Sequence, residues 1–162
     1  MKNWILAIAL SAFAAPVAAA YDYVAGYESW SVYKDTIDGE PVCYAVTRAT
    51  DKAPKSAEHG DVVFFVSYFR SSSMPQASLR VAYDLREDLK ATAAVGGSSW
   101  SLYSVRNEAF ANTDDETAIA NALRRGSELK IEAMSQRNTN VAYHFSLSGS
   151  SNAIDKAKSL CS

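Results

Sequence analysis

Two histidines, His59 and His144, limit the acid–base chemistry that this chain could perform near neutral pH. His144 lies in an alternating segment, on the side opposite Tyr143 and Phe145, which favours a solvent-facing or hydrogen-bonded structural residue over a general base. His59 lies in a polar stretch that contains Pro and Gly, and we interpret it as a loop residue. Neither histidine belongs to a recognisable catalytic motif.

Serines are numerous, but the chain contains neither a G-x-S-x-G elbow nor an S-x-x-K motif with its companions. One hydrolase hypothesis stays open, in which His144 activates a serine between Ser135 and Ser148. The glycines Gly96-Gly97 are not followed by the Lys-Ser or Lys-Thr of a phosphate-binding loop. The acidic run 114–116 lacks the spacing of a calcium loop and is better explained by helix capping. We therefore expect no catalytic, metal-binding or cofactor-binding residues and no enzymatic activity.

The first 20 residues have the parts of a secretory signal peptide: Lys2, an apolar run from Ile5 to Ala15, and the small residues Ala18-Ala19-Ala20. The apolar run is shorter than the about 20 residues that a membrane-spanning helix needs, and Pro16 ends it. We expect residues 1–20 to be removed, which leaves Tyr21 at the N-terminus. Residues 21–162 are then predicted to form a single β-rich domain with no membrane span.

The only two cysteines, Cys43 and Cys161, would both enter an oxidising compartment after export. We expect one intramolecular disulfide between them, which would attach the C-terminal tail to an early strand. An intermolecular bridge and a redox pair are the alternatives, although no C-x-x-C spacing is present to lower a thiol pKa.

The balance of charge excludes some partners. The chain has 16 Lys and Arg against 18 Asp and Glu, a formal net charge of −2, and loss of Lys2 makes it more negative. No strongly basic nucleic-acid surface and no polybasic membrane patch is therefore expected. We expect a monomer or weak oligomer, most simply in the periplasm, with outer-membrane association or secretion as alternatives. Its partner would be an unidentified envelope or host protein.

Seven segments alternate apolar and polar residues or concentrate β-branched and aromatic residues. They predict strands at residues 27–34, 42–47, 62–66, 77–84, 100–105, 128–133 and 141–147. Turns are expected at Asp38-Gly39 and Gly96-Gly97, a loop at 48–60, and no element is assigned to 85–95. The aromatic residues between Tyr21 and Tyr33 are interpreted first as sheet core and flanking contacts, with a binding surface as the alternative.

Two helices complete the expected fold. Thr113 and Glu116 have capping-box spacing, and Gly126 follows Arg124-Arg125 as a C-terminal cap would, so an internal helix is predicted between them. Ser151 could begin a short C-terminal helix that carries Ile154, Ala157 and Leu160. Together these elements predict a mainly β fold: an antiparallel β-sandwich or partly open barrel of about seven strands with one internal helix and a short C-terminal helix.

The polar connection 135–140 joins the two clearest strands and predicts a hairpin tip. Arg137, Asn138 and Thr139 in this tip are a candidate binding loop. The simpler interpretation is a tight turn in which Arg137 bonds to neighbouring backbone. An exposed rigid loop here would also suit a periplasmic enzyme inhibitor, which is a further alternative function.

Several segments resemble the invasion-associated locus B family of alphaproteobacterial envelope proteins. They are Trp30-Ser31-Val32-Tyr33, Cys43-Tyr44-Ala45, Ser135-Gln136-Arg137-Asn138-Thr139, Phe145-Ser146-Leu147-Ser148-Gly149, and the tail from Asn152 to Cys161. Their order and spacing follow the family across nearly all of the chain after residue 20. Asn138 stands where the family usually has glycine, which Asn can replace in a left-handed turn. The segment 68–76 lacks the family's glycine-containing turn.

The resemblance implies a secreted or periplasmic β-rich domain without established enzymatic activity, linked in some pathogens to host-cell entry. We therefore expect an exported, non-enzymatic envelope protein of this type, acting as a binding or interaction domain in envelope function or host-cell contact.

Overall fold

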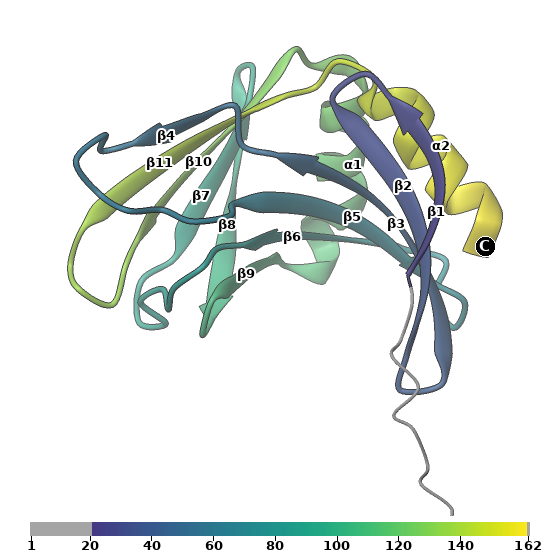
Figure 1. Ribbon diagram of the computed structural model, residues 1–162, viewed down its shortest axis with the longest axis horizontal. Coiled ribbons are helices and arrows are strands. Elements are labelled where there is room, and N and C mark those ends of the chain that lie inside the picture. The colour runs from purple at the N-terminus through teal and green to yellow at the C-terminus, as the bar shows by residue number, and fades with distance from the viewer. Residues whose placement is uncertain (1–20, 162) are drawn as a thin grey trace, which may run out of the picture.

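The computed structural model describes residues 21–161, and the predicted signal peptide lies outside them. The described chain is mainly β, as predicted, with two α-helices (Figure 1). Its strands in chain order are β1 Asp22–Tyr27, β2 Trp30–Ile37, β3 Glu40–Arg48, β4 Asp51–Ala53, β5 Val63–Phe69, β6 Pro75–Arg80, β7 Ala91–Val95, β8 Ser98–Val105, β9 Glu108–Ala111, β10 Glu128–Met134 and β11 Asn140–Ser146. The helices are α1 Glu116–Arg125, preceded by the 3-10 turn Thr113–Asp115, and α2 Ser150–Cys161. No helix within residues 21–161 has the length and apolar character needed to cross a membrane.

All eleven described strands belong to one open antiparallel sheet in the order β1-β2-β3-β5-β6-β9-β8-β7-β10-β11-β4. The predicted count of about seven strands is therefore wrong, and the sheet does not close into a barrel. Each of the seven predicted segments does overlap a strand. The predicted hairpin turns are also present, since Asp38, Gly39 and Gly96 have the positive φ angles of 51°, 83° and 58° that tight turns use.

Four strands were missed, and each had a weak local signal. β7 has three alanines among its five residues and β9 two among its four, and alanine has a low intrinsic preference for strands. β4 has three residues and lies inside the segment 48–60 that was predicted to be a loop. β1 is separated from β2 by a turn in which Glu28 has a φ of 52°, a conformation that is uncommon for glutamate.

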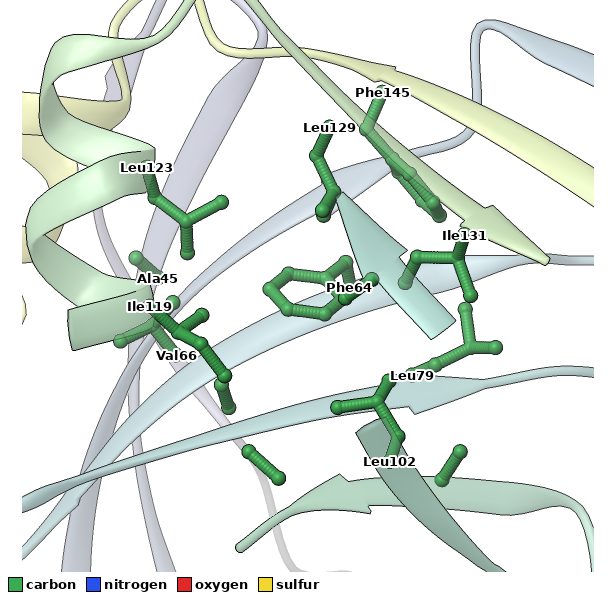
Figure 2. Close-up of a cluster of buried hydrophobic side chains, with 14 of the residues drawn as sticks. Ala45, Phe64, Val66, Leu79, Leu102, Ile119, Leu123, Leu129, Ile131 and Phe145 are labelled. Atoms are coloured by element: carbon green, nitrogen blue, oxygen red, sulfur yellow. The ribbon is translucent and has the colours of Figure 1, made fainter. Parts of the chain in front are cut away.

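The sheet is strongly curved, so that its two ends face each other across the core. β3 passes into β4 through Ala49 and Thr50 alone, and β4 then pairs with β11 at the far end of the strand order. Phe64 on β5 and Phe145 on β11 consequently meet with ring centroids 5.9 Å apart. Figure 2 shows this core, in which side chains from distant strands converge with Leu123 of α1.

Helix α1 covers part of the inner face, but its N-terminus differs from the prediction. The capping box is not formed: neither Asn112 before the 3-10 turn nor Asp115 before α1 makes a side-chain capping bond. Glu116 is instead buried, and one of its carboxylate oxygens accepts a hydrogen bond of 2.6 Å from the backbone N–H of Ala77 on β6. α1 ends where predicted, with Gly126 as its C-cap.

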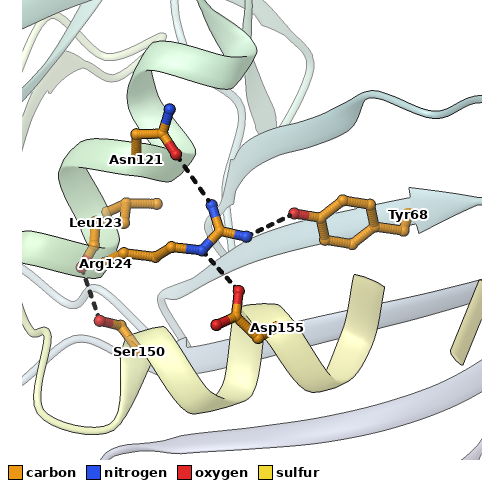
Figure 3. A network of polar contacts seen from close by, with 6 residues as sticks. All are labelled: Tyr68, Asn121, Leu123, Arg124, Ser150 and Asp155. Atoms are coloured by element: carbon orange, nitrogen blue, oxygen red, sulfur yellow. Dashed lines mark hydrogen bonds and ion pairs between the residues drawn. The ribbon is translucent and has the colours of Figure 1, made fainter. Parts of the chain in front are cut away.

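Helix α2 is joined to the sheet and to α1 by separate links. The disulfide Cys43–Cys161 connects it to β3, with the Cα atoms 5.7 Å apart, as the sequence predicted. Arg124 of α1 donates to Asp155 of α2 at 2.9 Å and to the hydroxyl of Tyr68 on β5 at 3.4 Å (Figure 3). Ser150 also donates to the carbonyl of Leu123 at 2.7 Å. Both helices are thereby fixed against the inner face of the sheet.

Candidate functional site

The candidate binding loop forms the tight turn between β10 and β11. Asn138 has a φ of 58°, so it occupies the left-handed conformation that the sequence suggested for this position. The N–H of Asn138 donates to the carbonyl of Ser135 at 2.9 Å, and the N–H of Thr139 donates to the Ser135 hydroxyl at 3.1 Å. The side chain of Arg137 is exposed and makes no hydrogen bond or ion pair with another described residue. The turn is thus held by its backbone and by Ser135, and the predicted backbone contact of Arg137 is wrong.

The segment 84–88 makes hydrogen bonds to this turn. Arg86 donates to the side-chain oxygen of Asn138 at 2.5 Å and also pairs with Asp88. The N–H of Arg86 donates to the carbonyl of Met134 at 2.9 Å, and the N–H of Gln136 donates to the carbonyl of Asp84 at 2.9 Å. The turn therefore presents Arg137 on a rigid support.

The turn borders a cleft of about 710 Å³ formed by three chain segments. Its lining residues are Ala57, Glu58, His59, Gly60, Ala82, Tyr83, Asp84, Gln136, Arg137, Thr139 and Val141. Two of the three predicted loop residues, Arg137 and Thr139, thus line it. The cleft contains charges of both signs, which does not define one class of ligand.

A buried chain of hydrogen bonds lies beside this cleft. One ring nitrogen of His59, Nε2, is 2.8 Å from the carbonyl of Pro54, which can only accept, so Nε2 carries a proton. In the neutral ring, Nδ1 then accepts from the hydroxyl of Tyr143 at 3.2 Å, and that hydroxyl in turn accepts from Tyr83. Burial raises the pKa of both tyrosines. His59 is therefore a buried structural residue with two partners, which its position in a polar loop did not reveal.

The other histidine also has a partner other than serine. Nδ1 of His144 lies 3.0 Å from a carboxylate oxygen of Glu128 on β10, in agreement with the structural interpretation. The hydroxyl of Ser135 accepts from the backbone, as described above. No Ser/His pair is thus brought together among residues 21–161, and no group of three residues there could hold a metal ion.

The most distinctive surface lies on the outer face of the sheet, opposite the helices. It is a row of aromatic rings on one face of the sheet, which we call the aromatic row: Tyr23 on β1, Tyr33 on β2, Tyr44 on β3, Phe65 on β5, Phe110 on β9 and Tyr103 on β8. Tyr23, Tyr33 and Tyr44 face one another directly, as do Phe110 and Tyr103, whereas Phe65 lies diagonally from Tyr44 and is separated from Phe110 by β6. Tyr33 and Tyr44 are stacked with centroids 5.7 Å apart, and Tyr44 meets the edge of Phe65 at 5.6 Å. The row crosses seven adjacent strands.

Alternation along each strand explains why these rings are outside. In β3, Cys43 and Ala45 are buried against α2 and the core, so Tyr44 between them must point to the opposite face. In β5, Phe64 and Val66 are buried in the same way, and Phe65 points outward. Five of the seven large hydrophobic residues that are exposed in the described chain lie on this outer face: Tyr21, Tyr23, Ile37, Tyr103 and Val105. Of the N-terminal aromatic residues that were interpreted as sheet core and flanking contacts, Trp30 is in the core, whereas Tyr21 and Tyr23 are exposed and make the flanking contacts, each against the ring of Tyr33.

A groove of about 280 Å³ interrupts the aromatic row near its middle. Arg80 lies over the ring of Phe65, 5.1 Å from its centroid, and pairs with Glu108 at 2.7 Å. Burial, followed by the negative charge of Asp35, raises the pKa of Tyr44 to about 12. Tyr44 therefore keeps its proton and stays a hydrogen-bond donor at any physiological pH.

Comparison with known proteins finds no matching family model and no matching curated protein. A solved structure does match, the crystal structure of invasion associated protein b from Bartonella henselae. The TM-score is 0.58 with 16% sequence identity, over 84% of this chain and 96% of that one. The sequences have diverged too far for the likeness to carry residue roles. The chain therefore has the fold of invasion associated protein B, as its motifs around Trp30, Cys43 and Cys161 indicated.

Proposed function

We propose that this protein is an exported, non-enzymatic envelope protein of the invasion associated protein B type, and that it binds its partner through the outer aromatic face. The observation that carries the proposal is the concentration of exposed aromatic and aliphatic side chains on that one face. Exposed apolar patches of this kind mark interaction sites, because soluble proteins otherwise keep such side chains apart. Tyrosine is also enriched among the residues that dominate binding energy.

The fold and the disulfide support export. The disulfide between Cys43 and Cys161 suits an oxidising compartment such as the periplasm. A relative in fold is named for its association with invasion, and contact with a host cell is one role that the proposal includes. N-terminal sequencing of the protein from the envelope fraction is expected to begin at Tyr21, and an intact Met1 would contradict export by signal cleavage.

Binding through the aromatic face is tested by sedimentation with washed envelope. We expect the double variant Tyr23→Ser/Tyr103→Ser to sediment at least about tenfold less than the wild type, a loss of about 1.4 kcal/mol. Both side chains are about half exposed or more, so these changes leave folding nearly unaffected. The matched control, Met74→Ser/Leu89→Ser, removes two exposed apolar side chains that are not part of the aromatic row, and it is expected to sediment normally. Equal sedimentation of all three proteins, or none by the wild type, would contradict the proposal.

A further inference from the structure

His59, Tyr143 and Tyr83 form a chain of hydrogen bonds whose direction depends on one proton, and we call them the histidine–tyrosine chain. Nε2 of His59 lies 2.8 Å from the carbonyl of Pro54, which can only accept, so the proton on Nε2 is fixed. Nδ1 is therefore the ring atom that can gain or lose a proton. It lies 3.2 Å from the hydroxyl of Tyr143, which is bonded in turn to the hydroxyl of Tyr83. Each of these hydroxyls can either donate or accept.

Tyr83 is the member of the chain that reaches the surface. Tyr143 is fully buried, and its ring meets that of His59 edge-on with the centroids 5.5 Å apart. Tyr83 is partly exposed and lines the cleft of about 710 Å³. Its hydroxyl bonds to Tyr143 and to no other group within residues 21–161. The remaining hydrogen-bonding capacity of Tyr83 is therefore available to the cleft.

With a neutral imidazole, the hydrogen bonds of the chain run inward. Nδ1 of His59 carries a lone pair, so Tyr143 must donate to it. The hydroxyl of Tyr143 has then used its only hydrogen, and it accepts from Tyr83. The hydrogen of Tyr83 is thus held inside the protein. In this state Tyr83 offers the cleft lone pairs alone and acts there as an acceptor.

A proton on Nδ1 reverses both bonds. Nδ1–H then donates to the oxygen of Tyr143, whose hydrogen turns to the oxygen of Tyr83. Tyr83 must direct its own hydrogen out of the chain. Glu58 and Asp84 line the same cleft, and their carboxylates make no hydrogen bond or ion pair with a described residue. The chain therefore loses no bond on protonation, and Tyr83 becomes a donor at the cleft.

The charges around His59 do not oppose this proton. Histidine is the side chain whose charge ordinarily changes between about pH 5 and 8. The charged side chains that border the ring are Glu58, Asp84 and Arg137 in the cleft, and Asp51, Lys52 and Lys55 in a neighbouring hollow of about 450 Å³. Acids and bases are equal in number in this set, and Asp51 is paired with Lys55. Both tyrosines of the chain stay protonated, because burial raises the pKa of each.

We propose that His59 is a pH-sensitive switch: proton uptake by its ring reverses the hydrogen bonds through Tyr143 and changes Tyr83 from an acceptor to a donor at the cleft. The switch also places a positive charge beside the cleft. A ligand that accepts a hydrogen bond from Tyr83 would then bind more tightly in acid, and a ligand that donates to Tyr83 would bind less tightly. The inference is independent of the outer aromatic face.

NMR titration of the full, disulfide-bonded protein tests the switch without a ligand. The ring nitrogens of both histidines and the Cζ carbons of the tyrosines are followed from about pH 8 to about pH 5. We expect His59 to begin as the Nε2–H tautomer and to gain its second proton within this range. The Cζ signal of Tyr83 should move with the same midpoint. His144 is the internal reference, because it pairs with Glu128 and bonds to neither tyrosine of the chain.

Two variants separate a hydrogen-bonded chain from simple proximity. Tyr143→Phe removes the middle hydroxyl, so the Tyr83 signal should no longer follow His59, whereas a direct effect of the ring charge would persist. Tyr83→Phe leaves the hydrogen of Tyr143 without an acceptor after reversal, so the midpoint for His59 should fall by about one pH unit. Tyr103→Phe, which removes an exposed hydroxyl on the outer face, is the control and should change neither result.

Three results in the wild type would each overturn the proposal, whether or not the variants fold. They are a His59 ring that stays neutral down to about pH 5, an Nδ1–H tautomer at about pH 8, and a Tyr83 signal that does not move with His59. Coupling that persists in Tyr143→Phe would overturn it as well, because the hydroxyl would then carry no signal. So would an unchanged midpoint in Tyr83→Phe.

Discussion

Glu116 is predicted to make the protein less stable as the pH rises from about 4.5 to 8. Its carboxyl group is buried at the start of α1, and burial, followed in the same direction by the nearby Asp115, raises its pKa from 4.5 to about 8 against the opposing hydrogen bond from Ala77. The folded protein therefore holds a proton that the unfolded chain releases. The stabilisation is fully present below pH 4.5 and is lost as the pH passes through 8. A shift of this size corresponds to at most about 5 kcal/mol over the whole interval, and solvent screening of the carboxyl group reduces that figure.

The measurement compares urea unfolding of the wild type and of Glu116→Gln at pH 5, 7 and 8.5, with the disulfide intact. Glutamine keeps an oxygen that can accept from Ala77 but cannot ionise, so the variant should be nearly equal to the wild type at pH 5. It should become more stable than the wild type by a few kcal/mol at pH 8.5. Asp114→Asn, a change to an exposed acid in the preceding 3-10 turn, is the control and should show a difference that does not vary with pH. A Glu116→Gln difference that is constant within about 0.5 kcal/mol would refute the burial of an ionisable carboxyl here.

Three further predictions concern the links that hold the fold. Replacing Cys43 and Cys161 together by serine should lower the free energy of unfolding by up to about 4 to 5 kcal/mol, because the bridge closes a loop with a sequence separation of 118; the unreduced wild type should show no free thiols when unfolded and labelled. Gly149→Ala should lower the melting temperature by several degrees, since Gly149 has a φ of 87° and an added Cβ would overlap the carbonyl of Tyr27; an unchanged melting temperature would contradict this packing. Arg124→Met should cost about 1 to 2 kcal/mol in urea unfolding, because the bonds to Asp155 and Tyr68 are lost while the aliphatic stem is kept; a loss within error would show that these bonds contribute nothing net.

Local sequence patterns predicted strands and turns well where the conformation of a residue depends on its neighbours in sequence. Asp38 and Gly39 form the expected tight turn, and Cys43 lies opposite Tyr44 because side chains alternate along any strand. The pattern failed at β7 and β9, where alanine carries no strand signal and pairing with neighbouring strands decides the conformation. The prediction that Glu116 completes a capping box was wrong for a similar reason. Its hydrogen-bond partner, Ala77, lies on a strand distant in sequence, and the capping-box pattern contains no information about that strand.

The aromatic row shows which part of a site lies beyond sequence patterns. The predicted strand 62–66 ended before Ser67, so the shared outward face of Phe65 and Ser67 was not predicted. That Phe65 faces Ser78, and Ser78 faces Phe110, depends on the order and register of three strands that no local rule supplies. For Arg137 the sequence predicted the turn correctly, but only the structure shows that its side chain contacts no other described residue by a hydrogen bond or ion pair.

The arrangement of the helices separates what stabilises the fold from what the outer face can do. Both helices and the disulfide act on the inner side of β2, β3, β5 and β6, and the buried side chains of these strands point there. The outer side of the same strands carries Tyr33, Tyr44 and Phe65; Tyr44 contacts both of the others, and no helix or strand of residues 21–161 covers these rings. Full burial of one large apolar side chain contributes about 1.5 to 3 kcal/mol to the free energy of folding, and each such side chain that stays exposed lacks this contribution. Because the inner side supplies the stability, substitutions at exposed outer positions should change binding while unfolding stays constant, and the two effects can be measured apart.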